Sequence, residues 1–261
     1  MSVNLLSVDK LSVTLRENKQ KLVRNVSFSI GDGGKLTLLG QSGSGKTMSC
    51  RAILGLLNSR SFQIDGTIEF DGNSLLSLAE GQRKKVYGNQ IAFIPQNPMT
   101  ALDPSRTVGH QMLQFIRLHQ SMSVSDARSR YIAALSETGL MQPERILKSF
   151  PHQLSGGMLQ RVLIALAFAQ NARLILADEP TTALDAIHRD QAVELLCKLQ
   201  KQGCAVLLVT HDFYVAEQMG GDVLILKDGE AVEQGGIGQV LTAPKADYTK
   251  ELIDAARLDW R

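Results

Sequence analysis

The sequence lacks long hydrophobic runs, a cysteine pattern and an excess of charge of either sign. Its longest apolar stretches, such as Val162 to Ala169, are far shorter than the ~20 residues that a membrane-spanning helix needs. The first residues do not combine a basic segment with an apolar one, so no export signal is predicted. We therefore expect a soluble protein, although one that can dock on a partner in a membrane.

Cysteine and charge exclude further classes of protein. The 3 cysteines, Cys50, Cys197 and Cys204, are odd in number and show no Cys-x-x-Cys spacing. This usage is typical of reduced thiols in the cytosol and argues against disulfides or a zinc-thiolate site. The 28 basic and 26 acidic residues are interspersed and give a net charge of +2. The sequence has no basic stripe, so its charge gives no indication of a nucleic-acid partner.

The stretch GQSGSGKT has the glycine and lysine spacing of a phosphate-binding loop. Glycines allow successive backbone N–H groups to surround phosphate oxygens, and the helix that follows directs its positive end at the same anion. An ordinary Gly/Ser turn is the alternative, but an apolar strand before the loop and a helical stretch after it favour phosphate binding. The candidate residues are Gly40, Gln41, Ser42, Gly43, Ser44, Gly45, Lys46 on the β- and γ-phosphates, and Thr47 on Mg²⁺.

Hydrophobic patterning predicts an α/β fold. The β-branched, alternating segments Leu5 to Leu15 and Val23 to Ile30, with IDGTIEFDG as short strands joined by Asp-Gly turns, predict an antiparallel sheet at one edge. Further along, apolar runs alternate with helical stretches such as Met48 to Leu57, the pattern of a buried parallel sheet with crossover helices. The expected parallel strands are Leu36–Leu39, Ile91–Pro95, Leu174–Ala177 and Ala205–Thr210.

A helical insertion interrupts this pattern. The three segments without a convincing strand between them are Val108 to Gln120, Asp126 to Thr138 and Glu144 to Lys148. The 261 residues are sufficient for one large domain with an inserted subdomain. We expect a nucleotide-binding core at about 1–96 and 159–235, a helical subdomain at 97–158 and a C-terminal tail at 236–261. The tail follows the strand-turn-strand DVLILKDGEAVEQG and becomes helical from about Ala246.

Two carboxylates follow the apolar run in RLILADEPTTALD. Ligands of open α/β sheets bind beyond the carboxyl ends of strands, so Asp178 and Glu179 are expected to face the phosphate loop. Asp178 is assigned to Mg²⁺, directly or through water, and Glu179 to the attacking water as the group that accepts its proton or orients it. A solvated strand end with two acids is the alternative.

A third motif, LSGGMLQR, places Ser155, Gly156 and Gly157 at the start of an apolar helix. By itself it predicts only a good N-cap. Its place among the other motifs is more specific. Nearly the whole chain resembles the nucleotide-binding subunits of ATP-binding cassette (ABC) transporters in the order of its motifs: phosphate loop, FIPQNP, LSGG, Asp-Glu strand end, ALD and LLVTHD. The resemblance implies a P-loop NTPase core with a parallel sheet, an N-terminal antiparallel β subdomain and an inserted α-helical subdomain.

The resemblance also implies roles for single residues. Two subunits of such ATPases bind head to tail, so Ser155 to Gly157 of one would close over the γ-phosphate held by the loop of the other. Gln96 would contact Mg²⁺ and the attacking water, Asp185 would bridge the two sites and His211 would bond the γ-phosphate. Lysine, Mg²⁺, helix N-termini and imidazole would then converge where phosphoryl charge is stabilised. The implied cofactors are ATP and Mg²⁺.

One position departs from the family. Its N-terminal strand usually offers an aromatic ring to adenine, whereas LSVTLRENKQ places Leu15 there. Leucine gives apolar contact without stacking, which is worth roughly 1–3 kcal/mol per base in nucleic-acid binders. We expect either weak nucleotide affinity, compensation by the partner, or an aromatic residue from elsewhere in the chain.

Three activities compete. An ATP-hydrolysing subunit that drives a membrane permease is favoured over a soluble cassette ATPase acting on DNA or ribosomes, because the chain has no second cassette, coiled-coil insertion or zinc cysteines. A phosphate-loop kinase would leave LSGG unexplained. The absence of a membrane span resembles bacterial importers that assemble from separate subunits. The chain is then expected at the cytoplasmic face of the cell membrane, as a peripheral subunit.

The solute is predicted from finer similarities. FIPQNPMTALDP, SGGMLQR and APKADYTKELIDA look most like the ATPases of the peptide and nickel import family. Such systems usually combine two different ATPases, two permease subunits and a substrate-binding protein. The absence of a cysteine after Cys204 and the Met158-Leu159 pair favour nickel or another transition metal, free or chelated, over oligopeptides or dipeptides.

Overall fold

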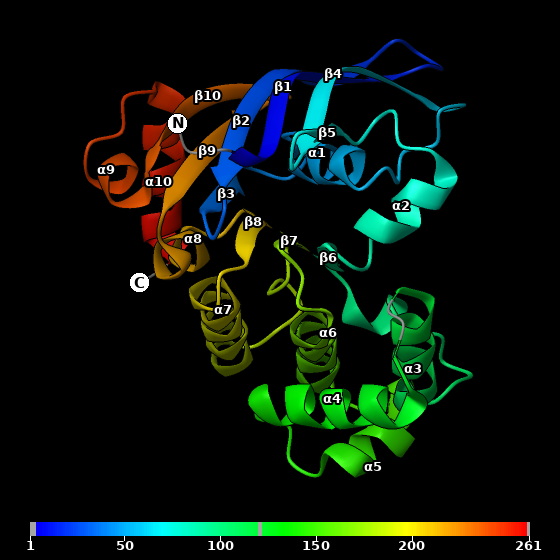
Figure 1. Ribbon diagram of the computed structural model, residues 1–261. Helices are drawn as coiled ribbons and strands as arrows, with labels where there is room; N and C mark the ends of the chain where they lie inside the picture. The colour runs from blue at the N-terminus through cyan, green and yellow to red at the C-terminus, as the bar shows by residue number, and fades with distance from the viewer. Residues whose placement is uncertain (1–3, 120–121, 260–261) are drawn as a thin grey trace. The chain divides into compact units, whose positions relative to one another are not determined.

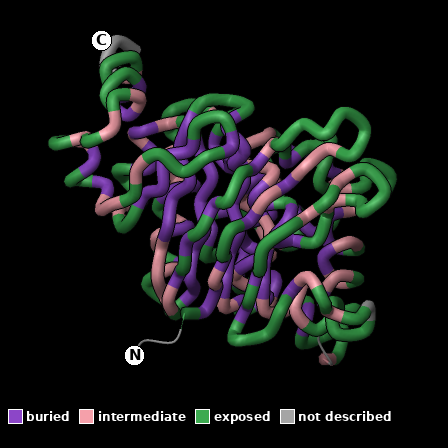
Figure 2. The backbone as a smooth tube through the Cα atoms, turned by 90° about the horizontal axis from the view of Figure 1, so that it is seen from above, coloured by how far each residue is buried: buried purple, intermediate pink, exposed green. Residues whose placement is uncertain are grey.

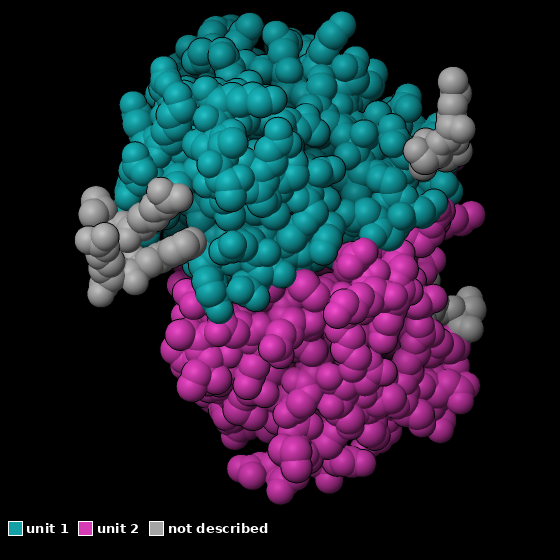
Figure 3. All heavy atoms as spheres, turned by 90° about the vertical axis from the view of Figure 1, so that its left-hand side faces the viewer, with its two compact units in different colours: residues 1–78, 205–261 teal, residues 79–204 magenta. Residues whose placement is uncertain are grey.

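The computed structural model describes residues 4–119 and 122–259, which form two compact units (Figure 3). The first unit contains the chain up to Leu78 and from Ala205 onward, and the second contains Ala79 to Cys204. Figure 1 shows both kinds of expected structure, with strands in the first unit and helices dominating the second. Within the described residues, no helix is both long and apolar enough to cross a membrane.

An antiparallel sheet opens the first unit, as the alternating segments predict. Strand β1 pairs antiparallel with both β2 and β4, and β5 continues the sheet beyond β4. The order across the sheet is β2-β1-β4-β5. The strands are β1 (Asn4–Leu15), β2 (Lys21–Gly31), β4 (Phe62–Phe70) and β5 (Asn73–Ser74).

The first Asp-Gly pair of IDGTIEFDG does not form the expected turn. Gly66 lies inside β4 with a φ of +96°, beside an irregularity in the pairing between Asp9 and Ser12 of β1. A Cβ at this position would meet the Asp9 carbonyl at 2.6 Å, so the glycine permits a bulge rather than a reversal of the chain. The second pair, Asp71 and Gly72, has two positive φ angles and is the hairpin turn between β4 and β5.

Parallel strands form the centre of the first unit. Strand β3 pairs in parallel with β8 on one side and β9 on the other, and β10 joins β9 antiparallel. All residues of β8 and the four central residues of β9 are buried, in agreement with their near-continuous apolar runs, and Figure 2 colours the buried residues of the chain purple. The strands are β3 (Lys35–Leu39), β8 (Ala205–Thr210), β9 (Asp222–Lys227) and β10 (Glu230–Gly236), and the helices are α1 (Lys46–Ile53), α8 (Phe213–Met219), α9 (Ile237–Thr242) and α10 (Asp247–Asp259).

Helix α1 is shorter than its sequence pattern predicts. It ends at Ile53 instead of Leu57, because Gly55 turns left-handed with a φ of +65°. The Leu56 N–H then donates to the Arg51 carbonyl at 3.0 Å and closes the last turn.

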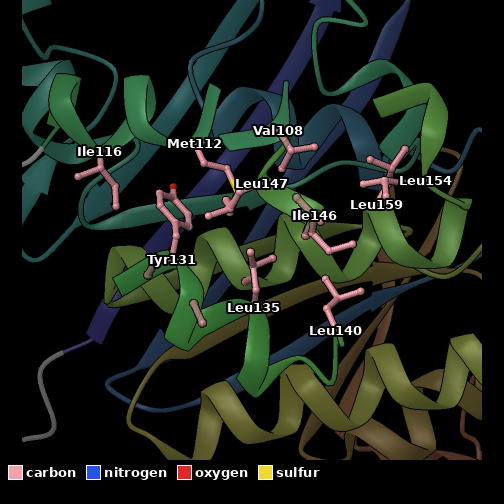
Figure 4. Close-up of a cluster of buried hydrophobic side chains, with 14 of the residues drawn as sticks. Val108, Met112, Ile116, Tyr131, Leu135, Leu140, Ile146, Leu147, Leu154 and Leu159 are labelled. Atoms are coloured by element: carbon pink, nitrogen blue, oxygen red, sulfur yellow. The ribbon is translucent and has the colours of Figure 1, made fainter. Parts of the chain in front are cut away.

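The second unit packs helices around one apolar cluster. Strands β6 and β7 pair in parallel, as expected. Figure 4 shows Met112 of α3 and Leu135 of α4 among the side chains that gather in this cluster, and burial of each of these two stabilises the unit by roughly 1.5–3 kcal/mol. The elements are α2 (Glu80–Val86), β6 (Ile91–Ile94), η1 (Pro98–Thr100), α3 (Val108–His119), α4 (Val124–Glu137), α5 (Pro143–Lys148), η2 (Pro151–Gln153), α6 (Gly156–Gln170), β7 (Leu174–Asp178) and α7 (Ala186–Lys201).

The three helices expected in the insertion are confirmed with small shifts. The first corresponds to α3, and Gln120 at its expected end lies outside the described residues. The second is α4, which begins two residues earlier than Asp126 because Ser123 caps it and accepts a hydrogen bond from the Asp126 N–H at 3.1 Å. The third is α5, whose first residue is Pro143.

Candidate nucleotide site

The phosphate loop lies between strand β3 and helix α1 of the first unit. Leu39 ends the strand, and the helix begins at Lys46. Gly40 has a φ of +155° and approaches the Leu226 carbonyl of β9 so closely that a Cβ would overlap that oxygen. Gly45 has a φ of +98°, and a Cβ there would lie 2.8 Å from the Leu22 carbonyl. Both glycines are required by the close approach of neighbouring backbone.

Lys46 is buried in this loop. Its ammonium donates hydrogen bonds to the Gly40 carbonyl at 2.7 Å and the Gln41 carbonyl at 2.8 Å. The first turn of α1 contains no acidic residue, so its N–H groups carry an uncompensated partial positive charge. A buried ammonium and a helix N-terminus therefore share one loop, which is the chemistry of an anion site.

A contact with the C-terminal helix was not predicted from the sequence. The Oη atom of Tyr248, in the first turn of α10, accepts a hydrogen bond from the Gln41 N–H at 3.5 Å. The Lys227 ammonium lies 4.5 Å from the centre of the same tyrosine ring. No local pattern reveals this contact, because Gln41 and Tyr248 are far apart along the chain.

The predicted acidic pair lies at the end of strand β7 in the second unit. Asp178 is its last residue and is 4% exposed, and Glu179 follows at 8% exposed. The Glu179 Oε2 atom accepts hydrogen bonds from Gln96 Nε2 at 3.1 Å and from Thr182 Oγ1 at 2.9 Å. The fold therefore brings Gln96 and Glu179 together. Thr182, the second threonine of TTALD, is a contact that sequence reasoning missed.

Glu179 also carries backbone strain. Its φ of +46° lies in the left-handed region, where a residue other than glycine costs of order 1–3 kcal/mol. Strain of this kind persists when the surrounding contacts hold the residue, and here Gln96 and Thr182 hold the carboxylate. The arrangement fixes the carboxylate of Glu179 through its Oε2 atom.

Ser155 caps helix α6 as its sequence predicts. Its Oγ accepts a hydrogen bond from the Met158 N–H at 3.2 Å. Gly156 has open space where a Cβ would be, whereas Gly157 lies against the ring of His188. Asp185 caps α7, and hydrogen bonds from the backbone and then the side chain of His188 hold the pKa of Asp185 below its ordinary value.

The remaining candidates belong to the first unit. His211 is exposed and directly follows strand β8. Leu15 ends β1 half-buried, and its antiparallel partner is Phe62 of β4. Residues directly opposite in an antiparallel pair project from the same face of the sheet, so an aromatic ring does lie beside Leu15. The sequence could not reveal it, because the bulge at Gly66 changes the register.

A comparison with protein families decides the classification. Residues 23–182 match the model of the ABC transporter family. The chain belongs to this family. It is 42% identical to the metal-staphylopine import system ATP-binding protein CntD of Staphylococcus aureus, over 98% of this chain and 94% of that protein. It is also 39% identical to the dipeptide transport ATP-binding protein DppD of Escherichia coli, over 96% of this chain and 78% of that protein.

Solved cassettes share the fold. The dimeric structure of a post-hydrolysis state of the ATP-binding cassette MJ0796, bound to ADP and Pi, is 30% identical to this chain. The superposition gives a TM-score of 0.78 and covers 89% of this chain and 98% of the cassette. This ABC protein is therefore an ATPase, and its motif residues form two sets. The phosphate loop, Leu15 and His211 are in the first unit, and Gln96, Asp178, Glu179, Ser155 to Gly157 and Asp185 are in the second.

Proposed function

We propose that Glu179 is the group that accepts the proton of the attacking water during ATP hydrolysis. The supporting observation is its buried carboxylate, which Gln96 and Thr182 hold through one oxygen. A buried carboxylate that two side chains hold through one oxygen is suited to orient a nucleophile and to take its proton. In this proposal Lys46 and the loop N–H groups bind the phosphates, and His211 bonds the γ-phosphate.

Mg²⁺ is assigned to Asp178, Thr47 and Gln96. A carboxylate, a hydroxyl and a side-chain amide supply hard oxygen ligands, which is the donor set that Mg²⁺ prefers. A bound Mg²⁺ would supply positive charge to neutralise the phosphates. Asp178 is buried as the last residue of β7.

Two cassettes are proposed to act together, head to tail. Ser155 to Gly157 of one subunit then close over the phosphate loop of the other, and Asp185 bridges the two sites. The open space at Gly156 supports this arrangement, because a phosphate can approach the first turn of α6 there. The partner is a second, different cassette in our proposal, so both copies of the site depend on the complex.

The permease is proposed to contact the helical part of the second unit. A groove of about 570 Å³ lies there and is lined mostly by apolar side chains, among them Phe93, Leu102, Phe115 and Leu118. Leu118 is 68% exposed. Pro95 directly precedes Gln96 in the chain and Phe93 lies three positions before it, so a partner segment in the groove has a short covalent path to the residue that holds Glu179.

The transported solute is proposed to be nickel or another transition metal, free or as a chelate. The 42% identity to a protein named for metal-staphylopine import supports this choice, and the 39% identity to a dipeptide system supports peptides as the alternative. In the cell this ATPase then lies at the cytoplasmic face of the membrane. It acts with two permease subunits and, through them, with a substrate-binding protein.

Deleting the gene and measuring uptake tests the solute. We expect lower accumulation of nickel and other transition metals, measured by elemental analysis, and unchanged uptake of a toxic peptide. Complementation with the original gene restores accumulation, whereas the Glu179→Gln gene does not, which ties the effect to hydrolysis. Normal metal accumulation with lost peptide uptake would reverse the choice of solute and leave the ATPase unaffected.

A further inference from the structure

His188 joins two of the motif segments of the second unit. It lies in the first turn of α7, and its Nδ1 atom is 2.8 Å from both carboxylate oxygens of Asp185. Its backbone N–H donates to the same carboxylate at 3.0 Å. Since the pKa of Asp185 is lowered, the carboxylate is ionised at neutral pH and only accepts hydrogen bonds. Nδ1 therefore carries the proton that is shared with Asp185.

The opposite edge of the imidazole lies on Gly157. A Cβ added to this glycine would be 2.6 Å from Cδ2 and 3.2 Å from Nε2 of His188. Ring and backbone are therefore in direct contact, and any side chain at Gly157 would displace the ring. The His188 side chain is 35% exposed, so protein atoms cover most of it. The same glycine is held from another side, because Arg161 Nε donates to its carbonyl at 3.3 Å.

We propose that His188 is a positioning residue that fixes the Asp185 turn to the Ser155–Gly157 turn. It belongs to neither motif, yet one edge of its ring bonds Asp185 and the other contacts Gly157. The ring therefore holds the two turns in a fixed position relative to each other, so that both contact a second subunit as one rigid surface. The proposal rests on the head-to-tail arrangement proposed above and adds the residue that keeps the two contributing segments in register.

Two variants test the two contacts of the His188 ring one at a time. In His188→Asn the amide nitrogen takes the place of Nδ1, so the hydrogen bond to Asp185 is kept and the ring edge on Gly157 is lost. In His188→Leu an apolar group still covers Gly157, but the donor to Asp185 is lost. His188→Ala removes both contacts. None of these variants changes a residue of the phosphate loop, Gly40 to Thr47.

The experiment compares nucleotide binding with closure and turnover in the full-length chain. ATP-dependent dimerisation is measured in the Glu179→Gln background, ATP affinity by titration of the monomer, and kcat and KM by phosphate release. We expect His188→Ala to weaken dimerisation and to lower kcat about tenfold. His188→Asn and His188→Leu are each expected to change both quantities about threefold. Effects of this size are usual for the coupling between residues in contact. Monomer ATP affinity and the melting temperature are expected to stay unchanged.

A double-mutant cycle with Gly157→Ala tests the contact itself. The added methyl group collides with the ring in the parent protein but finds space when His188 is alanine. Gly157→Ala is therefore expected to weaken dimerisation less in the His188→Ala background than in the parent. Additive effects, or parental dimerisation and kcat in His188→Ala, would overturn the proposal.

The same assay distinguishes this proposal from the head-to-tail model. If the Glu179→Gln parent does not dimerise with ATP in any combination with its partner cassette, the proposed arrangement of subunits fails and the role of His188 falls with it. If that parent dimerises normally and His188→Ala dimerises equally well, only the role of His188 is wrong. If a variant melts at a lower temperature, the Asn and Leu variants decide, since a positioning role predicts partial function from each.

Discussion

Glu179 is the residue whose substitution tests the chemistry most directly. The amide of Glu179→Gln can still accept from Gln96 and Thr182 through its oxygen, so the local fold is expected to persist. It cannot take a proton from water, and phosphate release is expected to fall by roughly 100-fold or more. ATP binding, measured by titration, is expected to stay near the parent value. The exposed Glu194→Gln on α7 is the matched control, and parental turnover in Glu179→Gln would contradict the assigned role.

Single-residue variants also test the proposed adenine contact. Leu15 and Phe62 are opposite each other on one face of the antiparallel sheet. Leu15→Phe is expected to tighten ATP binding and Phe62→Leu to weaken it, each within the roughly 1–3 kcal/mol that stacking on a base is worth. Gln63→Leu, on the other face of β4, is the control and is expected to bind ATP as the parent does. Equal affinities for all variants in a calorimetric titration would remove both residues from the nucleotide site.

Helix α6 is the element on which the proposed head-to-tail site depends. Gly156 lies in its first turn with open space around it, so Gly156→Asp is expected to leave the monomer folded. The new carboxylate would face the γ-phosphate of the partner and repel it in a dry interface. We expect ATP-dependent dimerisation to be lost while the melting temperature is unchanged.

The first turn of α2 provides the matched control for this charge. Gly81 also has open space, so Gly81→Asp introduces the same carboxylate near a helix start outside the motifs. Dimerisation of this variant is expected to equal that of the parent. If Gly156→Asp transported at the parental rate in cells, the head-to-tail arrangement would be refuted.

The start of α10 depends on one carboxylate of β10. Burial raises the pKa of Glu233, but hydrogen bonds from the backbone N–H groups of Lys245 and Ala246, at 2.9 and 3.0 Å, outweigh this effect and hold it below its ordinary value of 4.5. A lowered pKa means that the contribution to stability is complete above pH 4.5 and disappears as the pH falls through the folded-state pKa.

Glu233→Gln tests the contribution of these two hydrogen bonds to stability. We expect it to lower the free energy of unfolding by about 1 kcal/mol at pH 7, the usual worth of a capping side chain, and to show a smaller difference from the parent as the pH approaches 3.5. Thermal unfolding over this pH range measures both effects. Glu230→Gln, whose exposed ion pair with Arg24 spans 3.5 Å, is the control and is expected to change little. A difference that is constant with pH would contradict the assignment.

At the scale of the whole molecule, transport requires the ATPase to act on a permease. Leu118→Asp places a charge at the rim of the apolar groove, so it is expected to abolish transport in cells and co-purification with the permease. Phosphate release by the purified ATPase is expected to be unchanged, since the catalytic residues are untouched. Met141→Asp is the control, because Met141 is 84% exposed and does not line the groove. Normal transport by Leu118→Asp would exclude the groove as the contact.

Local signals in the sequence determined a large part of this protein. The glycine spacing from Gly40 to Gly45, the N-caps Ser155 and Asp185 and the apolar runs of β3, β7 and β8 each depend on neighbours within a few residues. Backbone conformation, capping and burial periodicity act over such short distances, so the pattern predicts the element. The order of these motifs along the chain sufficed for the family.

Tertiary structure decided which distant residues meet. The hydrogen bond between Gln96 and Glu179 joins residues 83 positions apart, and Phe62 faces Leu15 only in the register that the bulge at Gly66 sets. The contacts of Tyr248 with Gln41 and of His188 with Gly157 depend in the same way on how helices pack. Such contacts leave no local pattern, because their energies depend on strand register and on helix packing that the whole fold determines.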